Sequence, residues 1–162
     1  MNNYLPTDYQ AFIHTSRYAR WLDSEGRRES WPETVGRYMN DVVRRALDTD
    51  TISIAKEIED AILSLNLMPS MRAMMTAGPA LDRDNTAGYN CSYLPVDDPK
   101  SFDEAMYILL CGTGVGFSVE RQFISKLPDV PELFESETTV VVKDSKEGWA
   151  KGFRQVLALL WA

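Results

Sequence analysis

The chain has 162 residues, of which 44% are hydrophobic and 10% aromatic, and this composition is typical of a globular domain rather than a disordered chain. Its 24 acidic and 17 basic residues give a net charge of −7, and no cluster of Lys and Arg exceeds a pair, which argues against a nucleic-acid-binding surface. The sequence has neither an apolar run of the roughly 18 residues that span a bilayer nor the pattern of a signal peptide. We therefore expect a cytoplasmic protein that contacts neither membranes nor nucleic acids.

Residues 1–66 are predicted to form an N-terminal helical region. Ser30 and Glu33 have the spacing of a capping box that begins one helix. A break at 48–51 precedes a second helix, whose apolar stripe comprises Ile54, Ile58, Ala61, Ile62 and Leu65. The aromatic residues of this region are interpreted as packing residues: Tyr18, Trp21 and Trp31. We expect no chemistry from this part of the chain.

From residue 67 onward the sequence alternates between strand and helix signals. The stretch 69–85 is rich in Pro, Gly and Ala, and its methionines are interpreted as core filler. A strand is predicted over 89–96, followed by a helix from Asp98 to about Leu110 with Asp98 as its N-cap. Gly112 is predicted to end that helix, and the next strand is expected over 115–121.

The last third of the chain is predicted to contain a loop, a strand and a helix. The β-branched residues of 138–143 favour a strand. Asp144, with Glu147 three residues later, is expected to cap a final helix. That helix runs to the last residue with no glycine or cap, so we expect an interrupted chain, either a fragment or the first piece of a split gene.

Two cysteines and one histidine limit the chemistry that the chain can perform. Cys91 and Cys111 do not form a Cys-x-x-Cys pair or a disulfide framework. With His14 as the sole histidine, neither a histidine-based zinc site nor a Ser-His-Asp triad is expected, and we predict no metal ligands in this chain.

The run from Gly112 to Arg121, with glycines at 112, 114 and 116, is the most informative motif. Glycines at alternate positions leave amide groups uncovered, so the main chain can lie against a ligand. Its spacing is not that of a dinucleotide fingerprint, and no phosphate loop ending in Gly-Lys-Ser/Thr is present. Taken alone, the run is also compatible with a tight turn from helix to strand.

The ordered set of motifs resembles the start of the catalytic subunit of ribonucleotide reductases, and most closely the adenosylcobalamin-dependent class. The motifs that carry the resemblance are Met68-Pro69-Ser70, Thr76-Ala77-Gly78, Asn90-Cys91 and the run from Gly112 to Arg121. The stretch from Arg17 to Val35 is similar to the ribonucleoside-triphosphate reductases of that class, and the likeness returns weakly at 146–149. Each motif alone is weak, whereas their order and spacing are specific.

The resemblance implies an α/β fold in which residues 67–162 form the first part of a ten-stranded barrel. It implies reduction of ribonucleotides, as triphosphates or alternatively diphosphates, by thiyl-radical chemistry. The radical would reside on a cysteine outside this chain. The implied cofactor is adenosylcobalamin, bound mainly by parts not in this chain. The implied partners are a ribonucleotide substrate, a dNTP effector, a thioredoxin-like or dithiol reductant and the remaining C-terminal part of the enzyme.

The resemblance also assigns roles to residues of this chain. Cys91 matches the redox-active thiol, and its partner in the family lies beyond residue 162, so Cys111 is interpreted as structural. Substrate contacts are implied for Ser70, Asn90 and Gly114. Asp97 and Asp98 match the start of the effector site, although Asp98 is also a plausible helix cap. From the residues alone, Ser70 is equally a turn or capping serine.

Two other classes of function remain open on the sequence. One is a non-catalytic binding module, a barrel fragment that folds only with a second chain. The other is an unrelated small α/β protein whose glycine run is a turn. Independent two-state folding of this chain would favour the small protein, and a partner polypeptide carrying the remaining cysteines would favour the split enzyme.

Overall fold

The computed structural model describes residues 4–48 and 51–161. The chain divides into two compact units, Met1–Gly88 and Tyr89–Ala162, which we call the N-terminal unit and the C-terminal unit. The chain contains both helices and strands, in agreement with the predicted α/β class. The boundary predicted at residue 66 separates the helical region from the start of the barrel of a reductase. The two compact units do not test that boundary, so it stays a prediction.

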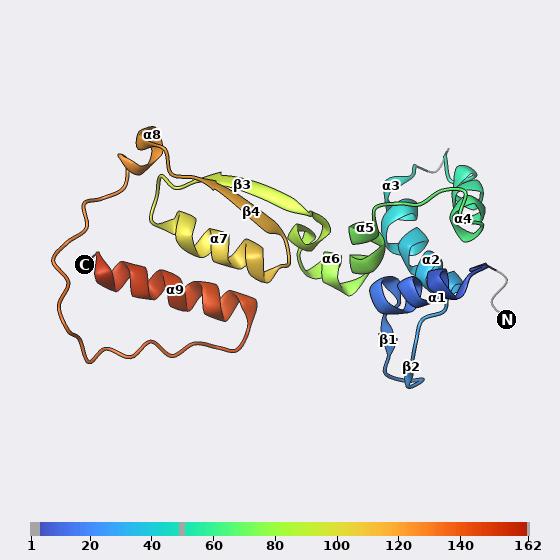
Figure 1. Cartoon of the computed structure of the whole chain (residues 1–162), viewed down its shortest axis with the longest axis horizontal. Coiled ribbons are helices and arrows are strands. Elements are labelled where there is room, and N and C mark those ends of the chain that lie inside the picture. The colour runs from blue at the N-terminus through green and yellow to red at the C-terminus, as the bar shows by residue number, and fades with distance from the viewer. Residues whose placement is uncertain (1–3, 49–50, 162) are drawn as a thin grey trace. The chain divides into compact units, whose positions relative to one another are not determined.

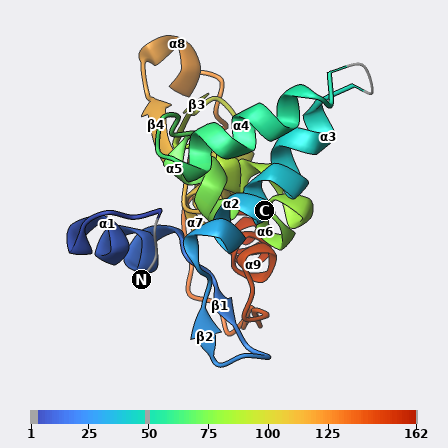
Figure 2. The same ribbon diagram turned by 90° about the vertical axis from the view of Figure 1, so that its right-hand side faces the viewer.

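The N-terminal unit is mainly helical, as predicted, but it also contains a hairpin that the sequence analysis missed. Its elements are α1 (Asp8–Ile13), a π-helical turn (His14–Tyr18), β1 (Trp21–Leu22), β2 (Arg27–Arg28), α2 (Trp31–Tyr38), a second π-helical turn (Met39–Val43), α3 (Arg44–Ala46), α4 (Ile54–Leu63), α5 (Met71–Thr76), α6 (Pro79–Arg83) and a 3₁₀ turn (Asn85–Gly88). The antiparallel strands β1 and β2 project from the helices (Figure 2). Gly26, with φ of +63°, lies in the turn that joins them.

The core of the N-terminal unit lies between α2, α4 and α5. It comprises Trp31, Val35, Met39, Ala55, Ile62 and Met74. The predicted capping box is confirmed, since Ser30 is the N-cap of α2 and its N and Oγ both donate to Glu33. The prediction that the aromatic residues pack holds for Trp31, which is 2% exposed, but it is wrong for Trp21, which is 55% exposed. The stretch 69–85 also forms the short helices α5 and α6, which its composition did not predict.

The C-terminal unit is built around a β-α-β unit. Its elements are β3 (Cys91–Pro95), α7 (Lys100–Leu110), β4 (Gly114–Ser118), α8 (Arg121–Ile124) and α9 (Lys146–Leu160). Strands β3 and β4 pair in parallel, with α7 as the crossover between them and α9 beside α7 (Figure 1). Both predicted strands are therefore present, although the second ends at Ser118 and its expected last residue, Arg121, begins α8.

Two predictions for the C-terminal unit are wrong. Residues 138–143 form no strand, and no partner strand for them exists among the described residues. They belong to a loop, with Val142 against Gly152 of α9. The cap of α9 is Ser145, whose Oγ accepts a hydrogen bond from Gly148 N at 3.0 Å, rather than Asp144.

Candidate active site

Cys91 and Gly114 lie directly opposite each other on the two parallel strands. Cys91 is the first residue of β3 and is exposed, and its Cα partner in the register is Gly114, the first residue of β4. Gly114 N donates to the backbone oxygen of Asn90 at 2.9 Å, which joins the two strand ends. Three of the residues predicted for the site, Asn90, Cys91 and Gly114, are thus brought together.

The thiol lies on the face of the sheet that α7 does not cover. Side chains alternate along a strand, so Leu94 and Val115 occupy the face opposite to that of Cys91. Leu94 and Val115 line a cavity of about 380 Å³ together with Phe102 of α7, which identifies their face as the helix side. On the other face, the residue opposite Cys91 on β4 is Gly114, which has no side chain that could cover the thiol.

Hydroxyl groups that the sequence analysis overlooked hold this strand pair together. Thr113 is 1% exposed, and its Oγ1 donates to the backbone oxygen of Tyr89 at 2.9 Å. Ser92 Oγ donates to the backbone oxygen of Gly114 at 3.1 Å. In the sequence, Thr113 stands out only as a hydroxyl residue between two glycines. The predicted strand began two residues later, at 115, so no contact was expected for Thr113.

Gly112, and not Gly114, has a positive φ, at +84°. Gly112 directly follows Cys111, the C-cap of α7, so it ends the helix as predicted. A Cβ added to Gly114 would lie 3.5 Å from the backbone oxygen of Asn90 and 3.9 Å from Cys91 Sγ, which are ordinary contacts. Gly114 therefore leaves room beside the thiol without being required by the backbone conformation.

The two aspartates after β3 have different partners. Asp97 forms an ion pair with Lys126 Nζ at 3.1 Å. Asp98 Oδ1 accepts a hydrogen bond from Lys100 N at 2.8 Å, while the N-cap of α7 is Pro99, one residue later than predicted. Asp98 thus helps to fix the start of α7, and Lys126 is a basic neighbour of Asp97 that the sequence analysis did not identify.

Ser70 belongs to the N-terminal unit, where it is the N-cap of α5. Its Oγ accepts from Ala73 N at 3.4 Å, and the residue is exposed. Ser70 thus acts as a capping serine, the alternative that the sequence had left open, and its exposed hydroxyl remains able to contact a ligand.

Cys111, the second cysteine, has a local partner. Lys146 Nζ donates to Cys111 Sγ at 3.2 Å, which links the end of α7 to the first residue of α9. Lys146 also lies 5.7 Å from the centroid of the Tyr107 ring. These contacts agree with the interpretation of Cys111 as a structural residue.

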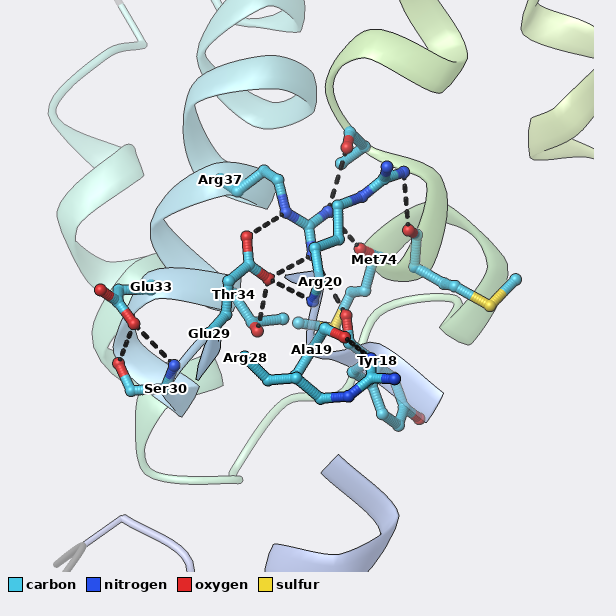
Figure 3. A network of polar contacts seen from close by, with 12 residues as sticks. Tyr18, Ala19, Arg20, Arg28, Glu29, Ser30, Glu33, Thr34, Arg37 and Met74 are labelled. Atoms are coloured by element: carbon cyan, nitrogen blue, oxygen red, sulfur yellow. Dashed lines mark hydrogen bonds and ion pairs between the residues drawn. The ribbon is translucent and has the colours of Figure 1, made fainter. Parts of the chain in front are cut away.

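A buried polar network occupies the N-terminal unit (Figure 3). Glu29 and Arg37 form an ion pair at 2.8 Å, and both side chains are largely buried. Thr34 Oγ1 donates to Glu29 at 3.0 Å, and His14 Nε2 lies 2.9 Å from the same hydroxyl. Burial raises the pKa of Glu29, but the hydrogen bonds from Arg37, the Arg20 backbone and Thr34 outweigh it, so its pKa is lowered overall.

The cavities described in the two units are smaller than a cobalamin. No group of three or more His, Cys, Asp and Glu side chains among them could hold a metal ion. Cavities found in the two units measure about 330 to 380 Å³, the lower end of the range for drug-sized ligands and too small for a corrin with its adenosyl group. Within residues 4–48 and 51–161, no helix is long and apolar enough to cross a membrane.

The fold and the site together define an α/β protein with an exposed thiol at the start of a parallel strand pair. The chain is similar to a crystal structure of a B12-dependent (class II) ribonucleotide reductase, with a TM-score of 0.67 and 21% identity over 93% of this chain and 29% of that one. This likeness establishes the relationship of the folds.

Curated relatives identify the particular enzyme that this chain resembles. Adenosylcobalamin-dependent ribonucleoside-triphosphate reductases from Lactobacillus delbrueckii subsp. bulgaricus and Lactobacillus leichmannii are 27% and 26% identical to it. Each alignment covers 82% of this chain and 22% of the relative, so the chain spans about a fifth of the length of these reductases. The reductase of Lacticaseibacillus paracasei is 28% identical over 85% of the chain. No protein-family model matches the chain. The resemblance predicted from the motifs is confirmed by these relatives.

Proposed function

We propose that this chain is the N-terminal part of an adenosylcobalamin-dependent reductase that converts ribonucleoside triphosphates to 2′-deoxyribonucleotides for DNA synthesis. The remaining part, on the same polypeptide or on a second one, would bind the cofactor. This chain together with that part is called the complete reductase below. Adenosylcobalamin would supply the radical chemistry when bound, and the residues of this chain would bind and reduce the substrate.

The observation that carries the proposal is the position of Cys91. The thiol is exposed at the end of a strand, on the sheet face that α7 leaves open, opposite a residue without a side chain. A strand fixes the Cβ of a reactive residue more firmly than a loop does. A ribose lying across the strand ends would thus meet the thiol without a side chain from Gly114 between them.

The chemistry proposed for Cys91 is delivery of two electrons together with a second cysteine. The two thiols lose two protons and two electrons and form a disulfide. The ribose gains them, because its 2′ hydroxyl leaves as water and a C–H bond replaces the C–O bond. An external dithiol, or a thioredoxin-like protein, then reduces the disulfide by thiol exchange.

The β-α-β unit suits the first part of the proposed ten-stranded barrel. A pair of strands is only marginally stable by itself, and both edges of this sheet are unpaired within the described residues. Several apolar side chains of the C-terminal unit are exposed: Leu109, Phe117, Val119 and Ile124. Further strands and helices would cover them. Asn90, Gly114 and Ser70 are proposed to contact the substrate, and Asp97 and Asp98 the dNTP effector.

Replacement of Cys91 tests the proposal. In the complete reductase with adenosylcobalamin, a ribonucleoside triphosphate and a dithiol, Cys91→Ser is expected to reduce steady-state turnover by about a hundredfold or more, because a hydroxyl cannot form a disulfide. Binding of the nucleotide, measured by calorimetry, is expected to change little, since the two side chains have nearly the same shape.

Cys111→Ser is the matched control. A serine hydroxyl can still accept the hydrogen bond from Lys146, so turnover is expected to stay within about twofold of the unmodified enzyme. Full turnover by Cys91→Ser would disprove its redox role. Absence of any ribonucleotide reduction by the unmodified complete reductase, with cofactor and nucleotide both bound, would disprove the proposed function itself.

A further inference from the structure

All the hydrogen-bond donors of the Arg37 side chain are engaged inside the N-terminal unit. A guanidinium has five N–H groups. Arg37 Nε and Nη2 each donate to Glu29 at 2.8 Å, and Nη2 also donates to the backbone oxygen of Tyr18 at 3.2 Å. The two N–H groups of Nη1 donate to the backbone oxygens of Met74 at 2.8 Å and Ala77 at 3.0 Å. Figure 3 shows this guanidinium at the centre of the network.

Arg37 and Arg20 act on the same short segment. Arg20 Nη2 donates to the backbone oxygen of Met75 at 3.0 Å, so two guanidinium groups hold three carbonyls at the end of α5. Carbonyls in the last turn of a helix have no partner within the helix. The two arginines supply these missing partners, and Glu29 binds both arginines, through the backbone N–H of Arg20 and the side chain of Arg37.

The strength of the ion pair alone does not account for this arrangement. A buried ion pair is often no more stabilising than apolar side chains of the same volume, because both charges must leave water. What the five directed hydrogen bonds add is a fixed geometry for the carbonyls that they bind. The element held in this way is α5, which has only six residues and therefore about 1.7 turns.

The opposite end of α5 carries Ser70. Its C-terminal end is fixed by the arginines and is buried at Met74 and Thr76, whereas Ser70 at the N-terminal end is exposed. Thr76 Oγ1 also donates back to the oxygen of Arg72 at 2.6 Å, which ties the last turn to the first. Because α5 is short and internally tied, a shift of its C-terminal end at the arginines would move Ser70 by nearly the same amount.

We propose that Arg37, assisted by Arg20 and held by Glu29, is a positioning residue for substrate binding: it fixes α5 so that Ser70 meets the phosphates of the nucleotide. This inference rests on the proposed function, in which Ser70 contacts the substrate. It assigns a functional reason to the buried network, whereas the sequence had predicted a packing region without chemistry for residues 1–66.

The test is a double-mutant cycle between Arg37 and Ser70 in the complete reductase. Arg37→Lys keeps the charge but cannot hold Glu29 and three carbonyls at once. We expect KM for the ribonucleotide to rise by about tenfold, because one charge-assisted hydrogen bond to phosphate is lost. The factor by which kcat falls should be smaller than the factor by which KM rises. Ser70→Ala should raise KM similarly, and the double variant should be no worse than the more severe single variant.

His14→Gln controls for a general loss of stability. His14 belongs to the same network, but its hydrogen bond goes to Thr34 and not to α5. We expect this variant to lower Tm without raising KM. If Arg37→Lys does not fold, Arg20→Lys replaces it in the cycle, because its side chain holds only the Met75 carbonyl and its loss is milder.

The possible results separate the inference from the proposed function. Additive effects of Arg37→Lys and Ser70→Ala on KM would overturn the positioning role, as would a KM unchanged by Arg37→Lys. If Ser70→Ala leaves KM unchanged, the inference falls although the reductase function stands. The proposed function fails separately, through an unmodified complete reductase that does not reduce ribonucleotides.

Discussion

At the scale of single residues, the accessibility of Cys91 depends on the residue opposite it. In a parallel pair, the residue across the ladder places its side chain on the same face, and for Cys91 that residue is Gly114. Any other amino acid at 114 would cover part of the thiol. The backbone does not require a glycine here, because its φ is not in the left-handed region, so the glycine serves to leave space beside the thiol.

Gly114→Val is expected to weaken ribonucleotide binding to the complete reductase by tenfold or more, roughly the loss of 1.4 kcal/mol. The Cβ itself fits, at 3.5 Å from the Asn90 oxygen, and valine favours strands, so stability should change by less than about 1 kcal/mol. Calorimetric titration with a nucleoside triphosphate and a thermal melt measure the two effects. Unchanged affinity in a folded variant would place the substrate elsewhere.

The sequence predicted the individual residues of the candidate site better than their supporting contacts. Cys91, Asn90 and Gly114 were assigned from the motifs of the family resemblance; their roles stay predictions, while the pairing of β3 with β4 brings them together. The bonds from Thr113 to Tyr89 and from Arg37 to Met74 join residues 24 and 37 positions apart. Neither a spacing rule nor a capping rule reaches that far, since such contacts exist only once the chain has folded.

At the scale of elements, the capping rules identified helix starts with an error of about one residue. Ser30 was correct, whereas Ser145 caps α9 in place of its neighbour Asp144. Residues 138–143 show why a strand cannot be predicted from composition alone. Their β-branched side chains give the right alternation, because Val140 and Val142 line one cavity with α9. A strand also requires a hydrogen-bonding neighbour, which they lack among the described residues.

Two helical glycines should respond in opposite ways to the same change. A Cβ on Gly148 of α9 would lie closer than 3.0 Å to the backbone of Lys143, whereas a Cβ on Gly36 of α2 would meet nothing within 4 Å. We expect Gly148→Ala to destabilise the protein by about 2 kcal/mol through overpacking. Gly36→Ala should stabilise it by up to about 1 kcal/mol through helix propensity. Denaturant melts measure both effects. If Gly148→Ala leaves the free energy of unfolding unchanged, the backbone of Lys143 does not pack on α9.

At the scale of the whole molecule, the order of motifs predicted the relationship that the comparisons found. The resemblance had been drawn from 17–122, and the curated relatives align with 82% of the chain. The structure adds a division into two units after Gly88. No composition change marks that point, because the short helices α5 and α6 continue the N-terminal unit beyond residue 69, where the sequence had indicated a new region.

This division predicts that acid will weaken the two units differently. His14, the sole histidine of the chain, is buried in the N-terminal unit, and burial lowers its pKa, with part of that shift offset by the charge of Glu29. A lowered pKa means that the unfolded chain takes up the proton first. The stability that neutral His14 contributes is therefore full above its ordinary value of 6.5 and is lost as the pH falls below it.

Between pH 7.5 and 5.5, hydrogen exchange should thus show decreasing protection in α2 and α4, by at most about 1.4 kcal/mol per pH unit. Protection in α7 and β4 should change less, because the C-terminal unit has no histidine. His14→Gln, which keeps a donor for Thr34 but does not titrate, should remove most of the decrease. An equal loss of protection in both units, or a loss that persists in His14→Gln, would mean that the network around Glu29 does not govern the acid response of the N-terminal unit.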